Sequence, residues 1–197
     1  MKNNKETQIL KAAEQVFFKK GFFPARMEDI AEAAGVAKGT LYLYFKDKTS
    51  IYMHLMSYRL EQAVKVLESM QHVKISATEK LDKVFKSWAD YYSQNKGMTS
   101  FVSLENINLT TELMKEMDTQ IKPRMIKMID MVTEIFRQGM RDKEFRKINP
   151  RVAAIYFTSA VRSFFVAHFY QFNLKDSEKV IKSLLLNGIK LNNKESK

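Results

Sequence analysis

The residues best suited to bind a charged partner lie close together, between Lys38 and Lys48. Lys38 and Gly39 open a short segment with helical periodicity, where free backbone amides and a small side chain allow close approach to a phosphate. Lys48 begins the next segment and is placed to bind a second phosphate. This spacing predicts a surface for a polyanion, with Tyr42, Leu43 and Tyr44 between the two lysines.

The elements that hold these residues must be short helices. The apolar residues Ile30, Ala31 and Ala34 predict a helix over 27–34, Gly35 breaks it, and a further helix follows over 38–45. A helix over 7–20 precedes them, with Ile9, Leu10, Ala13, Val16 and Phe17 on one face, and Gly21 ends it. Two short helices joined by a glycine-containing turn are typical of a helix-turn-helix. In this pattern Leu41 and Phe45 form the buried edge of the second helix with Tyr42 beside it, and Leu43 and Tyr44 are more exposed.

The rest of the chain also has helical rather than alternating periodicity, with only six glycines and three prolines. Helices are expected over 48–70, 77–94, 99–108, 110–117, 122–141, 150–172 and 176–191, with Asn149 and Asp176 as caps of the last two. The predicted fold is therefore all-α: an N-terminal three-helix head over 1–47, followed by a larger helical body over 48–197.

The charge of the chain agrees with an acidic partner but is a weak argument for one. The chain has 33 Lys and Arg against 22 Asp and Glu, a net charge of +11. Residues 1–48 hold 9 of the basic and 6 of the acidic side chains, so most of the excess lies in the body. A solubilising surface accounts for much of it.

Several classes of protein fit the sequence poorly. The absence of cysteine excludes disulfides and thiolate chemistry, and the three histidines lack metal-ligand spacing. We found no phosphate-binding glycine loop and no nucleophile elbow, so we expect neither a cofactor nor an enzyme. Because no apolar run reaches the length of a membrane span and the N-terminus lacks a signal-peptide core, the chain is expected to be soluble and cytoplasmic.

The run from Ile30 to Lys48, with its Leu-Tyr-x-x-Phe core and following lysine, resembles the helix-turn-helix signature of the TetR family of transcriptional regulators. The resemblance implies double-stranded operator DNA as partner, with contacts from Lys38, Gly39, Thr40, Tyr42, Leu43, Tyr44 and Lys48. The chain departs from the family pattern at Arg26-Met27-Glu28, near the start of the first helix of the motif, and at Ala37, just before Lys38; hydroxyl side chains are common at both places. Tyr42 is as well suited to core packing as to DNA contact.

The body contains a methionine-rich segment, with seven of the twelve methionines between residues 98 and 140. Methionine suits an ordinary core or a surface that accepts varied apolar ligands, and the residues alone weigh these equally. The family resemblance implies an effector cavity, and similarity over 104–162 suggests the branch that senses fatty-acyl thioesters. The resulting candidates for a hydrophobic effector pocket are Trp88, Tyr92, Phe101, Met128, Met131 and Phe165.

The last two predicted helices have apolar faces that can pair with a second copy or pack within one subunit. We favour a homodimer, because paired heads are how helix-turn-helix proteins read palindromes. The candidate interface consists of Phe157, Val161, Phe164, Ile181, Leu184 and Leu185. The leading hypothesis is a repressor released by its effector. The alternatives are an architectural or nucleoid-associated DNA binder without an effector, and a basic module that binds lipid or protein.

Overall fold

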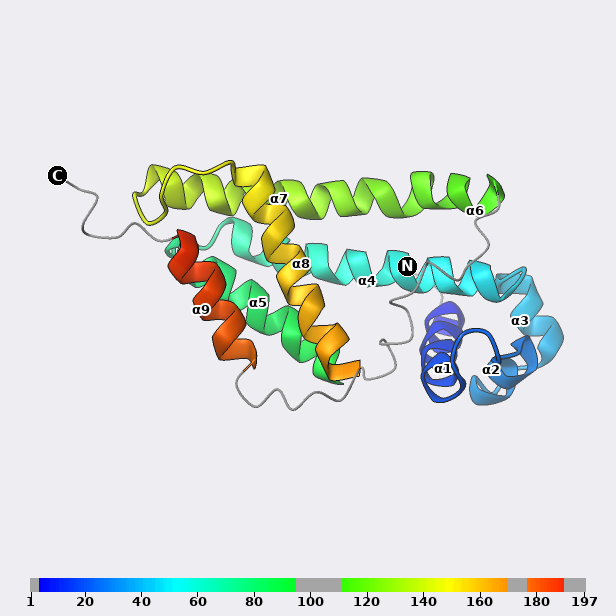
Figure 1. The fold of residues 1–197 in the computed structure, drawn as a ribbon. Coiled ribbons are helices and arrows are strands. Elements are labelled where there is room, and N and C mark those ends of the chain that lie inside the picture. The colour runs from blue at the N-terminus through cyan, green and yellow to red at the C-terminus, as the bar shows by residue number, and fades with distance from the viewer. Residues whose placement is uncertain (1–3, 95–110, 170–176, 190–197) are drawn as a thin grey trace. The chain divides into compact units, whose positions relative to one another are not determined.

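A computed structural model describes residues 4–94, 111–169 and 177–189 of the chain, and the regular elements of these residues are helices (Figure 1). Their bounds are α1 (Asn4–Lys20), α2 (Met27–Ala33), α3 (Lys38–Tyr44), α4 (Lys48–Gln71), α5 (Ala77–Gln94), α6 (Thr111–Glu116), a π-helical turn η3 (Met117–Ile121), α7 (Lys122–Arg141), α8 (Pro150–Phe169) and α9 (Ser177–Ile189). The predicted all-α fold is confirmed. The helix expected over 99–108 and the cap expected at Asp176 lie outside the described residues.

The helices divide into two compact units. One consists of residues 1–61 and 95–124, and the other of residues 62–94 and 125–197. Two helices, α4 and α7, contribute residues to both units. The predicted boundary at residue 47 coincides with the junction of α3 and α4, and the division into a 1–47 head and a 48–197 body stays a prediction.

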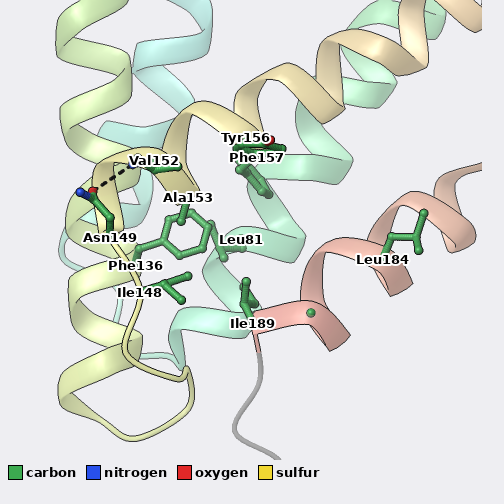
Figure 2. A pocket seen from close by; sticks show the side chains of 11 residues that line it. Leu81, Phe136, Ile148, Asn149, Val152, Ala153, Tyr156, Phe157, Leu184 and Ile189 are labelled. Carbon is green, nitrogen blue, oxygen red and sulfur yellow. Dashed lines mark hydrogen bonds between the residues drawn. The ribbon is translucent and has the colours of Figure 1, made fainter.

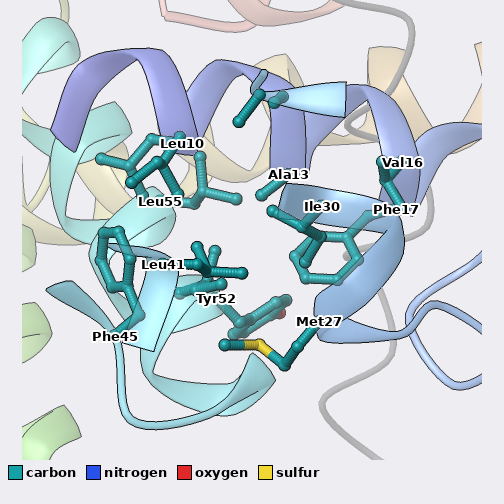
Figure 3. Packing of buried hydrophobic residues seen from close by; sticks show 14 of the residues in the cluster. Leu10, Ala13, Val16, Phe17, Met27, Ile30, Leu41, Phe45, Tyr52 and Leu55 are labelled. Atoms are coloured by element: carbon teal, nitrogen blue, oxygen red, sulfur yellow. The ribbon is translucent and has the colours of Figure 1, made fainter. Parts of the chain in front are cut away.

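The first unit has its own apolar core, built where α1, α2, α3 and the first half of α4 meet (Figure 3). The predicted inward residues of α1 are all buried, and Ile30, Leu41 and Tyr52 bring the other three helices into the same cluster. Ile121 of η3 is also buried there. Burial of each large apolar side chain stabilises the fold by about 1.5–3 kcal/mol, so α2 and α3, each only seven residues long, are stable when packed against α1 and α4.

The turns that follow α1 and α2 each contain a glycine with a positive φ angle. Gly21 follows α1 with φ +81°, and its amide donates to the Phe17 carbonyl at 2.9 Å. Gly35 follows α2 with φ +61°, a conformation that side chains rarely adopt. A Cβ at Gly35 would meet nothing within 4 Å, so this turn requires glycine for its backbone angle rather than for lack of space.

The second unit has a separate core formed by α5, α7 and α8, with Phe136, Phe145 and Phe157 among its buried rings. The loop after α7 also holds α5: the Glu144 carboxylate accepts hydrogen bonds from the Ala77 and Thr78 amides at 2.8 and 2.9 Å. The predicted cap of α8 is confirmed, since the Asn149 carboxamide oxygen accepts from the Arg151 and Val152 amides.

Candidate nucleic-acid interface

Helix α3 is held on one side by the core and open on the other. Leu41 and Phe45 are fully buried, as predicted, whereas Leu43 is 85% exposed. Because most of its surface is exposed, Leu43 adds little buried apolar area to the described part of the chain. The open side of α3 is therefore available to a partner.

The two tyrosines of α3 differ in exposure in the order opposite to the prediction. Tyr42 is 44% exposed, while Tyr44 is half-buried and packs against the core of its unit. At 100° per residue both rings lie about 80° from the centre of the buried edge, so periodicity could not rank them. The helix ends at Tyr44 and Phe45 adopts an extended conformation (φ −139°, ψ 121°), so the ideal helical wheel no longer applies at this point.

Gly39 lies on the open side of α3, and a Cβ built on it would meet nothing within 4 Å. Glycine inside a helix costs about 1 kcal/mol relative to alanine. Nothing among the described residues requires this glycine, because it has neither a positive φ nor a close neighbour. The missing side chain leaves the α3 backbone accessible from outside, with Thr40 half-exposed beside it.

Lys38 does not face solvent alone. Its ammonium forms an ion pair with the Glu28 carboxylate of α2 and lies 6.0 Å from the centre of the Tyr42 ring. The hydrogen bond between the two groups raises the pKa of Lys38 and lowers the pKa of Glu28. Both are therefore charged at neutral pH, and a phosphate that approaches Lys38 must compete with a carboxylate already bound there. The sequence showed Glu28 only as a departure from the family pattern.

Lys48 has a structural role beyond the predicted phosphate contact. Its ammonium donates to the carbonyls of Phe23 and Ala25 at 2.8 and 3.0 Å and lies 4.7 Å from the centre of the Phe22 ring. These contacts tie the start of α4 to the connection between α1 and α2. Burial lowers the pKa of Lys48. Two of its three N–H groups are used, which leaves one for a phosphate.

The second unit has a pocket of about 310 Å³, which we call the α8–α9 pocket (Figure 2). Leu81, Phe136 and Phe157 line its inner wall, and Val152, Tyr156 and Leu184 lie at its outer side. The last three side chains are exposed, Tyr156 by 70% and Leu184 by 73%. The pocket therefore opens on the surface between α8 and α9.

Of the predicted effector residues, the three whose side chains are described, Trp88, Met128 and Met131, do not line this pocket. Trp88 is buried in the core beside Phe157, Met128 packs partly against the same core, and Met131 lines a smaller pocket elsewhere in the unit. The side chains of Tyr92, Phe101 and Phe165 lie outside the described residues. The placement of the effector among these six residues stays a prediction.

Two of the predicted dimer contacts need correction. Phe157 and Val161 are 2% and 1% exposed, because they belong to the core of their own subunit. Leu184 is exposed as expected, and the side chains of Phe164, Ile181 and Leu185 lie outside the described residues. Among the described side chains of these two helices, the large apolar ones that are exposed are Val152, Ile155 and Tyr156 on α8 and Val180 and Leu184 on α9. We call these five residues the α8–α9 face. Both sides of α8 are apolar, so the sequence pattern did not distinguish the inner side from the outer.

Among the described residues, no group of three or more His, Cys, Asp or Glu side chains is arranged to hold a metal ion. No described helix is long and apolar enough to cross a membrane.

The segment that contains α1, α2 and α3 matches a known family of proteins. Residues 9–55 match the family model described as "Bacterial regulatory proteins, tetR family". The "Fatty acid metabolism regulator protein" of Bacillus subtilis is 29% identical over 138 residues, which cover 70% of this chain and 71% of that protein.

Solved structures share the fold over nearly the whole chain. The fatty acid degradation regulator FadR from Bacillus halodurans has a TM-score of 0.79 at 24% identity, and covers 95% of this chain and 97% of its own. The transcriptional regulator FadR from Bacillus subtilis, solved in complex with stearoyl-CoA, has a TM-score of 0.73 at 24% identity over 93% and 98% of the two chains. This chain is a helix-turn-helix DNA-binding protein. Its residues 9–55 are similar to the TetR family, and it is a TetR-like transcriptional regulator.

Proposed function

We propose that the chain is a homodimeric repressor, active in the cytoplasm, that holds a palindromic operator through α3 and releases it when a hydrophobic effector binds the body. The observation that carries the DNA contact is the open side of α3, where Gly39 has space around it and Leu43 is 85% exposed. Such a helix fits a DNA major groove, which is about 12 Å wide.

The contacts we assign are those of the predicted surface, with roles adjusted to the geometry. Leu43 and Tyr42 face outward and are placed to touch base edges or sugar, while Lys38 and Thr40 are placed to bind phosphate. Gly39 lets the backbone approach the duplex. Tyr44 and Lys48 combine any DNA contact with packing inside the unit.

Gly39→Ala tests this assignment because it moves two measurements in opposite directions. The free protein should gain up to about 1 kcal/mol in unfolding free energy, since alanine favours helix and the new methyl meets nothing. Operator affinity, measured by fluorescence anisotropy on a site selected from random duplexes, should fall at least tenfold. A variant that is more stable and binds as tightly as the original would show that the backbone near Gly39 does not approach DNA.

The effector we propose is a long-chain fatty-acyl thioester. The support is the likeness to a regulator of fatty acid metabolism and to a fold neighbour solved with stearoyl-CoA. The coupling we infer runs through α4 and α7, because each of them has residues in both compact units. An effector that favours one arrangement of these helices would change the separation of the two heads, which must match about 34–36 Å for successive major grooves.

Stearoyl-CoA is the probe for this proposal. Saturating amounts should lower operator affinity strongly, and nearly complete release requires about 5.5 kcal/mol of preference for the released form. Mass spectrometry of molecules retained by the purified protein gives an independent readout. Operator affinity that is unchanged under saturating probe, with no retained ligand, would favour the architectural DNA binder instead.

The dimer we propose is formed by the α8–α9 face. Its five residues present apolar surface on neighbouring helices, and a two-fold copy would cover the open α8–α9 pocket. An exposed apolar patch of this kind is typical of an interaction surface.

A further inference from the structure

The open side of α3 presents an apolar side chain to its surroundings. Leu43 is 85% exposed, more than any other large apolar side chain that the structure describes. Gly39 lies one turn before it on the same side of the helix, and a Cβ built there would meet nothing within 4 Å. Because side chains on an α-helix lean toward its N-terminus, Leu43 extends over the space that Gly39 leaves free. The two methyl groups of Leu43 are therefore accessible to a partner.

The polar side chains of α3 are poorly suited to reading bases. The seven residues of this helix include no Arg, Asn or Gln, the residue types that form paired hydrogen bonds with guanine or adenine. Its one lysine, Lys38, is already paired with Glu28, and Thr40 is only half-exposed. Tyr42 offers a single hydroxyl group. We therefore expect apolar contact to contribute much of the base recognition by α3.

Thymine is the base whose major-groove edge suits a leucine. It presents a C5 methyl group there, whereas guanine, adenine and cytosine are distinguished by polar donors and acceptors. A leucine pressed against those polar groups would remove their water without replacing the lost hydrogen bonds, which costs free energy. Contact between a leucine and a thymine methyl group instead buries apolar surface on both sides. Because this methyl group lies in the major groove, the contact also reports which groove α3 enters.

We propose that Leu43 is a specificity-determining residue that contacts the C5 methyl group of a thymine in each half of the operator. This role of Leu43 rests on the proposed contact of α3 with DNA, and it identifies which feature of the base is read. Contacts of Lys38 and Lys48 with phosphate would add affinity but no sequence information. Base preference at this position follows the methyl group, so thymine is preferred to uracil and 5-methylcytosine to cytosine.

Replacement of thymidine by deoxyuridine removes the methyl group and preserves the hydrogen-bonding groups of the base pair. The full chain is first used to select an operator from random duplexes, and each thymidine of that operator is then replaced singly. Affinities are measured by fluorescence anisotropy. At the thymine that Leu43 contacts, the replacement should weaken binding about fourfold, as expected for the burial of one methyl group. Replacements at thymines outside this contact should have no such effect.

Leu43→Ala identifies the side chain that senses the methyl group. This variant should bind the original operator more weakly, and deoxyuridine at the contacted position should then cause no further loss. Leu43→Met keeps a long apolar side chain and should retain most of the deoxyuridine effect. Tyr42→Phe is the matched control on the same helix and should retain the full effect, because it removes only a hydroxyl group. All three variants should fold, since both positions are exposed, and weak binding is measured at lower salt.

Methylated cytosine gives a second measurement with the original chain. A C·G pair in place of the contacted T·A pair should weaken binding, and 5-methylcytosine in that C·G pair should recover about fourfold in affinity. Such recovery separates recognition of the methyl group from a preference for the shape or stiffness of A·T-rich DNA.

Three results would overturn the role of Leu43: deoxyuridine weakens binding at no position, Leu43→Ala shows the same deoxyuridine effect as the original chain, or cytosine and 5-methylcytosine bind equally well. A chain that selects no operator from random duplexes would instead contradict the proposed function. An operator that is selected but shows no methyl effect leaves DNA binding intact and removes only the role of Leu43. The two failures are therefore distinguishable.

Discussion

Glu28 forms an ion pair with Lys38, a lysine of the predicted DNA surface. Because Lys38 is already paired with this carboxylate, part of its attraction for phosphate is spent within the protein. Glu28→Gln should therefore tighten operator binding by about threefold to tenfold at low salt, through release of Lys38 and removal of a negative charge near the duplex. Fluorescence anisotropy at several salt concentrations measures the change.

Glu32→Gln is the control for Glu28→Gln, because it removes an equal charge from an exposed position on the same helix. Equal tightening by both variants would mean that only net charge matters. The pH dependence has a definite sign. The pKa of Glu28 is lowered and that of Lys38 raised, so neither group titrates between pH 6 and 9 and the difference in affinity should be constant there. It should shrink only as the pH falls through the lowered pKa of Glu28, when the original chain also loses this charge.

Lys48 is expected to matter for stability before it matters for DNA. Lys48→Met keeps the aliphatic stem but removes the donors to the Phe23 and Ala25 carbonyls, so we expect a loss of about 1–2 kcal/mol in unfolding free energy by urea denaturation. Lys11→Met, at an exposed position of α1, should lose almost nothing.

The same Lys48→Met variant decides whether the remaining N–H group reaches DNA. The slope of log affinity against log salt should fall by about one unit if Lys48 contacts a phosphate. A stable fraction of folded protein with an unchanged slope would remove Lys48 from the DNA contacts.

At the scale of elements, the end of α7 depends on a glycine that the sequence pattern did not single out. A Cβ at Gly139 would collide with ring carbons of Phe145, which is itself buried against Phe136. Because the ring lies inside a packed core, it cannot swing away. Gly139→Ala should therefore cost about 2 kcal/mol or more, measured by thermal or urea unfolding.

Two further variants serve as controls for Gly139→Ala. Gly39→Ala, in a helix where the new methyl meets nothing, should be stabilising, so the two variants are expected to have opposite signs. Gly139→Ala combined with Phe145→Leu should recover part of the loss. A neutral Gly139→Ala would show that the loop after α7 can rearrange freely.

The elements themselves were largely predictable, because apolar periodicity and glycine or proline breaks determine where helices start and stop. The bounds of α5 and α7 agree with the prediction at both ends, and those of α2, α3 and α4 within one residue. The π-helical turn at Met117–Ile121 was not predictable, since no residue type marks it. Sequence periodicity also did not predict the Glu28–Lys38 ion pair, whose residues are 10 positions apart, or the capping of α5 by Glu144, whose partners are 66 and 67 positions away.

At the scale of the whole molecule, the proposed dimer should depend on the α8–α9 face. Leu184→Arg places a charge at an exposed position of that face and should convert a dimer to monomers at micromolar concentration in analytical ultracentrifugation. The fold should survive, because Leu184 is 73% exposed in the single chain.

Met114→Arg is the matched control for Leu184→Arg. Met114 is an exposed apolar residue of α6, away in sequence from the two helices of the face, and its replacement should leave the dimer intact. If Leu184→Arg remains dimeric, the subunits associate through another surface. Equal dissociation by both variants would point to a general effect of added charge.

The sequence was less informative at this scale, because composition identifies apolar helices without saying which of their sides is covered. Phe157 and Tyr156 are adjacent aromatic residues, and one is buried while the other is 70% exposed. The family resemblance anticipated a cavity, but not that the α8–α9 pocket would be lined by Tyr156 and Leu184. Such assignments require the packing of helices distant in sequence.

The continuity of α4 and α7 through both compact units has a consequence for how such proteins can be recombined. To exchange the first compact unit for that of a relative, joints must be made within α4 and within α7, where each added residue turns the following segment by about 100° and advances it by 1.5 Å. Since two helices make the connection, both joints must preserve the same helical phase. Chimaeras with a one-residue insertion in α4 near Gln62 should therefore lose operator control even when each half folds, whereas grafts that keep both phases should transfer the head's specificity intact.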